Sequence, residues 1–178
     1  MNCGPHHRVE FISGIEFAKS DTIANWQIVN DGVMGGCSRS QFVRGEGTAI
    51  FAGGLSLENN GGFASVRSLR ARHDWQEATG LAIRVRGDGR SYRLTARMET
   101  NFERALYQAP FTTRAGEWQE HSFRCEEFAP SFRGRDLAGE PALVLAQVAS
   151  VGFLIADRQA GPFRLEVAWI RLFRIPRV

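Results

Sequence analysis

Lysine is almost absent from this chain of 178 residues, and blocks of like charge are missing. Lys19 is the single lysine, so the cationic side chains are nearly all arginines, and they are scattered along the sequence. The formal net charge is only +3 at pH 7. A nucleic-acid-binding arm or stripe needs clustered cations, so we expect no nucleic-acid partner.

Cysteine is scarce as well, since Cys3, Cys37 and Cys125 are the only three. An odd number with no C-x-x-C pair fits neither a disulfide framework nor a zinc ribbon, and it favours a reducing compartment. Cys3 lies near His6 and His7, but a segment so close to the terminus rarely fixes the geometry of metal ligands. We therefore expect no metal and no cofactor.

Long apolar runs are also missing. No stretch approaches the ~18 apolar residues of a membrane-spanning helix. The N-terminus has neither the apolar core of a secretion signal nor the Arg- and Ser-rich character of a transit peptide. We expect no membrane span, a loose N-terminal tail at residues 1–16 and a single domain at residues 17–178.

Alternation of apolar and polar residues, the period of a β-strand, dominates the rest of the chain. It is clearest at residues 80–98, where Asp88-Gly89 separates two alternating runs. Asp-Gly between such runs is typical of a two-residue hairpin turn. This hairpin would place Arg84 directly opposite Arg93, and we expect both side chains to extend into solvent.

About ten short strands with turn signals between them predict an all-β sandwich or barrel. Val151–Ala156 and Ala168–Phe173 are apolar on both faces, which predicts central strands covered on both sides. Glu126–Asp136 is expected to be a loop, and helix is expected only as single turns within Leu69–Ala78 and Leu143–Val148. Further strands are expected at Ser38–Arg44, Thr48–Leu57, Phe63–Leu69, Leu106–Thr113 and Glu117–Cys125.

Two glycine-dense loops carry the main indication of function. They read W-Q-I-V-N-D-G-V-M-G-G-C-S at Trp26–Ser38 and N-N-G-G-F-A-S-V-R at Asn59–Arg67. Adjacent glycines cost backbone entropy, so they indicate positive φ or close backbone approach, and the polar side chains beside them predict a recognition surface. The candidate binding residues in these loops and at other polar strand ends are Asp31, Gly35, Gly36, Asn60, Gly61, Gly62, Arg67, Asp88, Arg90, Asp157 and Gln159.

Catalytic signatures are weak. The G-D-G at residues 87–89 lacks the third glycine and the following helix of a dinucleotide-binding fingerprint. Ser65 does not stand in a G-x-S-x-G motif. Asp31 and Asp157 are the candidates for a glycosidase-type acid–base pair, but turn capping and pairing with arginines explain these carboxylates more simply.

Several longer motifs follow one another along the chain. Besides the two glycine loops they are R-V-R-G-D-G-R-S-Y at Arg84–Tyr92, Y-Q-A-P-F at Tyr107–Phe111 and G-F-L-I-A-D-R-Q-A-G-P-F-R-L-E at Gly152–Glu166. On these motifs the chain resembles the complex I intermediate-associated protein family, named for an assembly factor of mitochondrial NADH:ubiquinone oxidoreductase. The resemblance spans roughly residues 17–173.

This resemblance implies a galactose-binding-domain-like jelly roll, which agrees with the strand count. It also implies a chaperone-like role in the assembly of respiratory complex I. The chain lacks the long N-terminal extension of mitochondrial members, so the resemblance implies a stand-alone bacterial-type member. The implied location is the cytoplasm, or the periphery of the inner membrane.

Three functions remain open from the sequence. The first is a non-catalytic assembly factor that shields a protein partner, with complex I subunits or intermediates as the expected partner. The second is a carbohydrate-binding module in which Trp75 or Tyr107 stacks on a sugar. An enzyme ranks last, so we expect no enzymatic activity. A structural role explains the polar residues equally well, for example a buried ion pair between Arg67 and Asp88.

Overall fold

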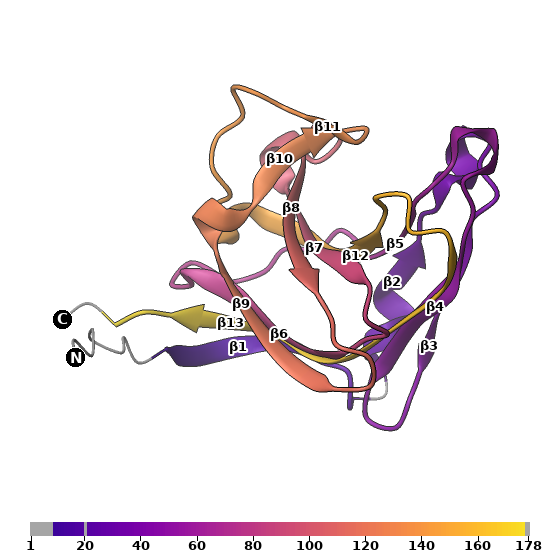
Figure 1. The fold of residues 1–178 in the computed structure, drawn as a ribbon. Coiled ribbons are helices and arrows are strands. Elements are labelled where there is room, and N and C mark those ends of the chain that lie inside the picture. The colour runs from indigo at the N-terminus through magenta and orange to yellow at the C-terminus, as the bar shows by residue number, and fades with distance from the viewer. Residues whose placement is uncertain (1–8, 20, 177–178) are drawn as a thin grey trace, which may run out of the picture.

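Two antiparallel β-sheets pack face to face in the computed structural model, which describes residues 9–19 and 21–176 (Figure 1). These ranges contain thirteen strands and no α-helix, which confirms the all-β prediction. Sheet A consists of β1 (Glu10–Glu16), β3 (Arg39–Arg44), β4 (Ala49–Leu55), β6 (Gly80–Arg86), β9 (Trp118–Arg124) and β13 (Gly161–Arg174). Sheet B consists of β2 (Trp26–Ile28), β5 (Ala64–Ser68), β7 (Ser91–Met98), β8 (Leu106–Thr112), β10 (Ala129–Phe132), β11 (Arg135–Asp136) and β12 (Val148–Ile155).

Six short 3-10 turns connect the strands of this described part. They are η1 (Thr22–Asn25), η2 (Asp31–Met34), η3 (Glu58–Asn60), η4 (Glu99–Asn101), η5 (Cys125–Glu127) and η6 (Leu145–Gln147). The turn η6 lies where a single helical turn is expected, whereas residues 69–78 contain no helix.

The two strands that are apolar on both faces lie at the centres of the sheets, as predicted. β13 pairs with β6 along one edge, while β4 and β1 share its other edge, one after the other. β12 lies between β5 and β7, and each of its eight residues is buried. Central strands bury side chains on both faces, which explains why their sequences do not alternate.

The core lies between the sheets, where the inward side chains of β6 and β7 face each other. Leu81, Ile83 and Val85 point inward from β6, and Tyr92 and Leu94 point inward from β7, all with an exposed fraction of 1% or less. Fully burying one such side chain contributes about 1.5–3 kcal/mol relative to leaving it exposed.

The predicted hairpin at Asp88-Gly89 is wrong, because β6 belongs to sheet A and β7 to sheet B. The connection crosses from one sheet to the other, and Arg84 pairs with Glu120 on β9 instead of lying opposite Arg93. Alternation alone cannot separate these arrangements. In a hairpin the two apolar faces lie side by side, and in a sandwich they face each other, but the sequence pattern is the same.

Four strands lie where none is expected, and one of them is β2, which falls within the glycine loop at Trp26–Ser38. Residues 10–16, placed in the N-terminal tail by the sequence, form β1 and pair with β13. Within the expected loop at residues 126–136, β10 and β11 pair with each other and β10 also pairs with β8. These strands are short or lie at sheet edges, so the apolar–polar alternation in their sequences is weak. In β10, Pro130 also argues against a strand. Cys3, His6 and His7 lie outside the described residues.

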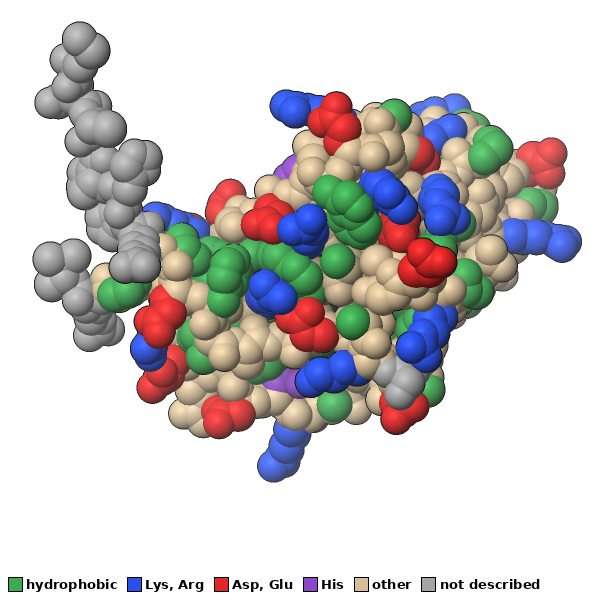
Figure 2. Space-filling model, turned by 90° about the horizontal axis from the view of Figure 1, so that it is seen from below, with side chains coloured by type: hydrophobic (Ala, Val, Ile, Leu, Met, Phe, Trp, Pro, Cys, Tyr) green, Lys and Arg blue, Asp and Glu red, His purple; other side chains and the backbone are tan. Residues whose placement is uncertain are grey.

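The outer face of sheet A carries an apolar patch near β1 and β13, which Figure 2 shows as a green area near one end of the molecule. Trp169 and Phe173 of β13 pack there with Ala82 of β6, and Phe11 of β1 meets Trp169 edge-on at 5.8 Å. The guanidinium group of Arg171 stacks over Trp169 at 4.3 Å. No helix in the described part of the chain is long and apolar enough to cross a membrane.

Candidate functional site

The two glycine loops meet around one buried carboxylate, that of Asp31. The first loop joins β2 to β3 and contains η2, and the second joins β4 to β5 and contains η3. Asp31 Oδ1 accepts a hydrogen bond from Ser38 N at 2.9 Å, and Oδ2 accepts one from the Ser38 hydroxyl. Oδ2 also accepts from the amides of Gly62 at 2.7 Å and Phe63 at 3.3 Å. One side chain therefore ties both loops into a unit, here termed the glycine corner (residues 29–38 and 56–63).

Four glycines allow the loops to close around this carboxylate. A Cβ at Gly36 would lie 2.4 Å from Asp31 Cγ, and a Cβ at Gly61 would lie 2.6 Å from Asp31 Oδ2, so neither position accepts a side chain. Gly35 (φ 87°) and Gly62 (φ 132°) adopt backbone conformations that other residues rarely take. The glycine pairs therefore serve both purposes expected of them, close approach and positive φ.

Asp31 is held inside the protein as an anion. Burial disfavours its charged form, but hydrogen bonds from Ser38, Gly62 and Phe63 outweigh burial and hold the pKa of the carboxyl below its ordinary value. The expectation that Asp31 lies on an accessible polar surface is thus corrected, because its exposed fraction is 0%. It cannot reach a substrate as one half of an acid–base pair with Asp157.

The surface that the glycine corner presents is apolar at its tip. Val33 and Met34, both in η2, have exposed fractions of 74% and 61%. In Figure 1 the loops after β2 and β4 project together from one end of the sandwich. The sequence analysis considered the polar residues of the loop and did not include this pair. The two apolar residues between glycines, V-M, were the feature of the sequence that could have indicated it. Large apolar side chains this exposed on a projecting turn are candidates for contact with a partner.

Asp88, Arg90 and Gln159 form a second cluster that joins two inter-sheet connections. Asp88 accepts hydrogen bonds from the Arg164 amide at 2.8 Å and from the Tyr92 hydroxyl at 3.0 Å. Arg90 donates to the carbonyls of Gln159 and the residue after it. The Gln159 side chain bonds both backbone groups of the first residue of β7, at 2.9 and 2.8 Å. The cluster fixes the β6–β7 connection against the β12–β13 connection.

Arg67 and Asp157 belong to neither cluster: Arg67 lies in sheet B, and Asp157 lies in the β12–β13 connection with its side chain directed to a strand of sheet B. Asp157 follows β12 and forms an ion pair with Arg93 of β7. Arg67 on β5 lies beside Gln27 of the neighbouring β2. The predicted ion pair between Arg67 and Asp88 does not form, since Asp88 has Arg90 as its cationic neighbour at 3.9 Å. The candidate residues therefore fall into three groups: the glycine corner (Asp31, Gly35, Gly36, Asn60, Gly61, Gly62), the inter-sheet cluster (Asp88, Arg90, Gln159) and sheet B (Arg67, Asp157).

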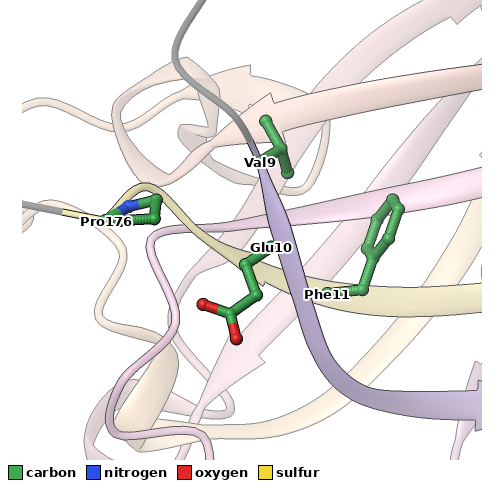
Figure 3. Close-up of a pocket in the computed structure, with 4 residues that line it drawn as sticks. All are labelled: Val9, Glu10, Phe11 and Pro176. Atoms are coloured by element: carbon green, nitrogen blue, oxygen red, sulfur yellow. The ribbon is translucent and has the colours of Figure 1, made fainter.

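Two shallow hollows on the described surface lie away from the glycine corner. One, of about 490 Å³, lies between the start of β1 and the end of the described chain, lined by Val9, Glu10, Phe11 and Pro176 (Figure 3). The other, of about 230 Å³, lies over the start of β13, lined by Arg86, Gly87, Asp88, Gly116, Arg164 and Glu166. In the second hollow Glu166 accepts from Arg86 at 2.7 Å and from Thr48 at 2.8 Å, so its carboxylate is already engaged.

The motifs that build the glycine corner and the inter-sheet cluster can now be compared with known proteins. The family model described as complex I intermediate-associated protein 30 (CIA30) matches residues 15–167. This range includes the glycine corner and the inter-sheet cluster. This chain belongs to the CIA30 family.

The CIA30 chain resembles mitochondrial proteins named complex I intermediate-associated protein 30. It is 29% identical over 182 residues to the one from Mus musculus, which covers 90% of this chain and 56% of the relative. It is 28% identical over 180 residues to the one from Drosophila melanogaster, which covers 88% of this chain and 61% of the relative. The chain thus spans less than two thirds of the length of these relatives.

Solved structures similar to the CIA30 chain are carbohydrate-binding modules and parts of agarases. A family 11 module of a Clostridium thermocellum cellulase has a TM-score of 0.62 and 16% identity, covering 86% of this chain and 90% of the module. A family 11 module from that organism, in complex with a β-1,3-1,4-mixed-linked tetrasaccharide, has a TM-score of 0.59 and 16% identity. The match covers 92% of this chain and 96% of the module. At such identities the likeness shows the fold alone, and it confirms the jelly-roll prediction.

The aromatic residues expected to stack on a sugar are buried in the CIA30 chain. Trp75 is 7% exposed, and its ring stacks on His73 at 4.3 Å. Tyr107 is fully buried, and its hydroxyl donates to the Pro141 carbonyl at 2.8 Å. Neither ring offers a free face, so the expected stacking platform at Trp75 and Tyr107 does not exist. Within the described residues no group of three or more His, Cys, Asp or Glu side chains is arranged to hold a metal ion.

Proposed function

We propose that this CIA30-family chain is a non-catalytic assembly factor that binds a subunit or intermediate of respiratory complex I and shields it until assembly proceeds. Support comes from the names of its relatives, complex I intermediate-associated protein 30. The observation that carries the proposal is the glycine corner, a rigid projecting turn with an apolar tip.

The structure of the corner suits a binding role. The buried carboxylate of Asp31 joins both loops, so they are already ordered before a partner arrives. Ordered loops lose less conformational entropy on binding, which raises affinity without new contacts. Val33 and Met34 then supply apolar area at the tip. A few apolar anchors at the centre of an interface carry much of its binding free energy.

The two carboxylates considered for catalysis, and the candidate binding residue Asp88, all have partners within the protein. Asp31 is buried, Asp88 accepts hydrogen bonds from Arg164 and Tyr92, and Asp157 is paired with Arg93. General acid–base chemistry needs a carboxyl group that reaches the reacting atoms. This arrangement supports binding in preference to catalysis.

The test is recovery of a partner from membranes of the organism that encodes the chain. We expect the affinity-tagged protein to recover complex I subunits, and the variant Val33→Ser/Met34→Ser to lose most of that recovery with an unchanged melting temperature. The control Val43→Ser/Val144→Ser removes apolar side chains that are 39% and 42% exposed outside the corner, and it should recover the partner normally.

Three results would count against the proposal. Recovery of no respiratory subunit, together with intact complex I in a deletion strain, would remove the assembly role. Equal recovery by the Val33/Met34 variant would remove the corner as the contact surface. Tight binding of a β-1,3-1,4-mixed-linked tetrasaccharide without any protein partner would favour the carbohydrate-binding alternative.

A further inference from the structure

Arginine side chains on the outer face of sheet B share one aromatic support. The guanidinium carbons of Arg67 on β5 and Arg97 on β7 lie 5.7 and 5.8 Å from the centroid of the Phe102 ring. Arg70 lies 4.6 Å from the same centroid. Phe102 is only 8% exposed, so the guanidinium groups cover it. Stacking uses the face of a guanidinium group and leaves its N–H edge for hydrogen bonds. On Arg67 the Gln27 side-chain oxygen can accept from Nε at 2.9 Å and from Nη2 at 3.3 Å, which leaves Nη1 for a further acceptor.

Two of these arginines have no carboxylate to balance them. Arg70 pairs with Glu99, whereas no carboxylate oxygen of a described residue lies within 4.0 Å of the guanidinium nitrogens of Arg67 or Arg97. Burial and then the charge of Arg67 hold the pKa of Arg97 below its ordinary value, although Glu103 acts against them from a greater distance. Two like charges are thus held close together with no carboxylate of a described residue in direct contact.

The hydrogen-bonding capacity of Arg97 is also incompletely used. Its Nη1 donates to the Phe102 carbonyl at 2.7 Å, but its Nε is buried and has no partner among the described residues. A buried donor without an acceptor costs about 1–3 kcal/mol, so such groups call for an explanation. Because Nε is closed to solvent and Nη1 is bonded, Nη2 is the donor that Arg97 has left for a bound anion.

The surrounding sheet face is polar and suits an extended chain. Gln27, Arg67, Gly152, Thr95 and Gln108 occupy one continuous register line across β2, β5, β12, β7 and β8. Gly152 places no side chain between Arg67 and Thr95, whose backbones are two strand spacings, or about 10 Å, apart. In Figure 1 this face lies between the raised β10–β11 and the projecting glycine corner.

We propose that the outer face of sheet B binds an acidic segment of the protein partner, with Arg67 and Arg97 gripping one of its carboxylates. The inference rests on the assembly-factor role proposed above and names the chemistry that the partner must carry. Arginine binds carboxylates through paired N–H···O bonds, and two adjacent arginines select an anion over a neutral group. A neutral sugar fits less well, because guanidinium groups cover the ring of Phe102 that it would need for stacking.

A fluorescein-labelled hexaglutamate peptide tests the proposal by fluorescence anisotropy at low salt. We expect the wild-type chain to bind it and Arg67→Gln/Arg97→Gln to bind at least ~10-fold more weakly, since a hydrogen bond to a charged group contributes about 1.5–3 kcal/mol. The matched control is Arg39→Gln/Arg44→Gln, which removes the same charge from two exposed arginines of β3. Arg67→Gln alone provides a milder variant should the double variant fold poorly.

Each other outcome overturns either this inference or the assembly role on which it rests. Equal binding by the wild type and the sheet B variants, or no binding by any protein, would exclude a carboxylate site at these arginines. Arginine-dependent binding of oligogalacturonate without hexaglutamate binding would replace the peptide by an acidic sugar. If sheet B variants still recover complex I subunits while Val33→Ser/Met34→Ser does not, this inference fails and the assembly role stands. If hexaglutamate binds as expected but no subunit is recovered, the assembly role fails instead.

Discussion

Replacing Asp31 by asparagine should destabilise the chain more than any other near-isosteric change at the glycine corner. Asparagine keeps the shape but replaces one acceptor oxygen with an amide group, which in the place of Oδ2 faces the Ser38 hydroxyl and the backbone amides of Gly62 and Phe63. A buried donor that loses its partner costs about 1–3 kcal/mol. Because the three donors depend on one group, their losses are not additive, and we expect about 3–5 kcal/mol in total. That loss corresponds to a fall in melting temperature of about 10 °C for a chain of this length.

Urea unfolding followed by tryptophan fluorescence measures this change directly. The matched control is Asp157→Asn, because that side chain is 53% exposed and its surface ion pair with Arg93 should contribute less than ~1 kcal/mol. An Asp31→Asn variant within ~0.5 kcal/mol of this control would refute the structural role of the carboxylate.

The pH dependence of Asp31 gives a second check with a defined sign. The pKa of its carboxyl is lower in the folded state than the ordinary value of 3.8. The stabilisation is therefore complete above the unfolded-state pKa and is lost as the pH falls through the folded-state pKa. The stability gap between the wild type and Asp31→Asn should be largest at neutral pH and should shrink below about pH 4. A gap that stays constant on acidification would contradict this account.

Two further predictions concern steric fit and titration. Gly36→Ala should cost at least ~2 kcal/mol because its Cβ would lie 2.4 Å from Asp31 Cγ, whereas Gly32→Ala, with nothing within 4 Å of its Cβ, should change stability by less than ~1 kcal/mol in the same urea titration. Burial holds the pKa of His121 below its ordinary value of 6.5, so protonation of the unfolded state should lower stability as the pH falls below 6.5. His121→Phe should flatten this decline in thermal melts between pH 7 and about pH 5, and an unchanged slope would contradict it.

The sequence predicted the strands of the core well because alternation reports local burial. It could not tell which sheet each strand joins. A hairpin and a sandwich both bury Val85 and Tyr92, so their apolar character does not distinguish the two arrangements. Which strands pair with β6 is decided by contacts with residues far along the chain. Asp88 provides one of them, since its carboxylate accepts from the backbone of Arg164 on β13. No local pattern reveals a hydrogen bond between residues 76 positions apart.

The candidate site, like the pairing of the strands, depends on contacts between distant residues that the sequence does not reveal. The glycine pairs correctly indicated close approach and positive φ, but they did not indicate which group they approach. Polar side chains beside the glycines predict a polar surface that includes Asp31, and aspartate is rarely buried without a cationic partner. Here the hydroxyl of Ser38 and backbone amides take the place of a cation, and backbone donors leave no trace in sequence composition. The apolar tip at Val33 and Met34 was visible in the sequence, but its exposure was not.

The residues that make this chain recognisable are therefore poor probes of what it binds. Removing Asp31 or filling Gly36 is expected to loosen the corner, so loss of a partner after either change would report unfolding as readily as a broken contact. Val33 and Met34 are different, because their side chains extend from the corner into solvent. Their replacement leaves the hydrogen bonds that join the loops in place. The two arginines of sheet B differ in this respect. Arg97 also donates to a backbone carbonyl, so its replacement can loosen the fold as well as remove a contact. The Arg67 variant therefore gives the cleaner measurement of binding.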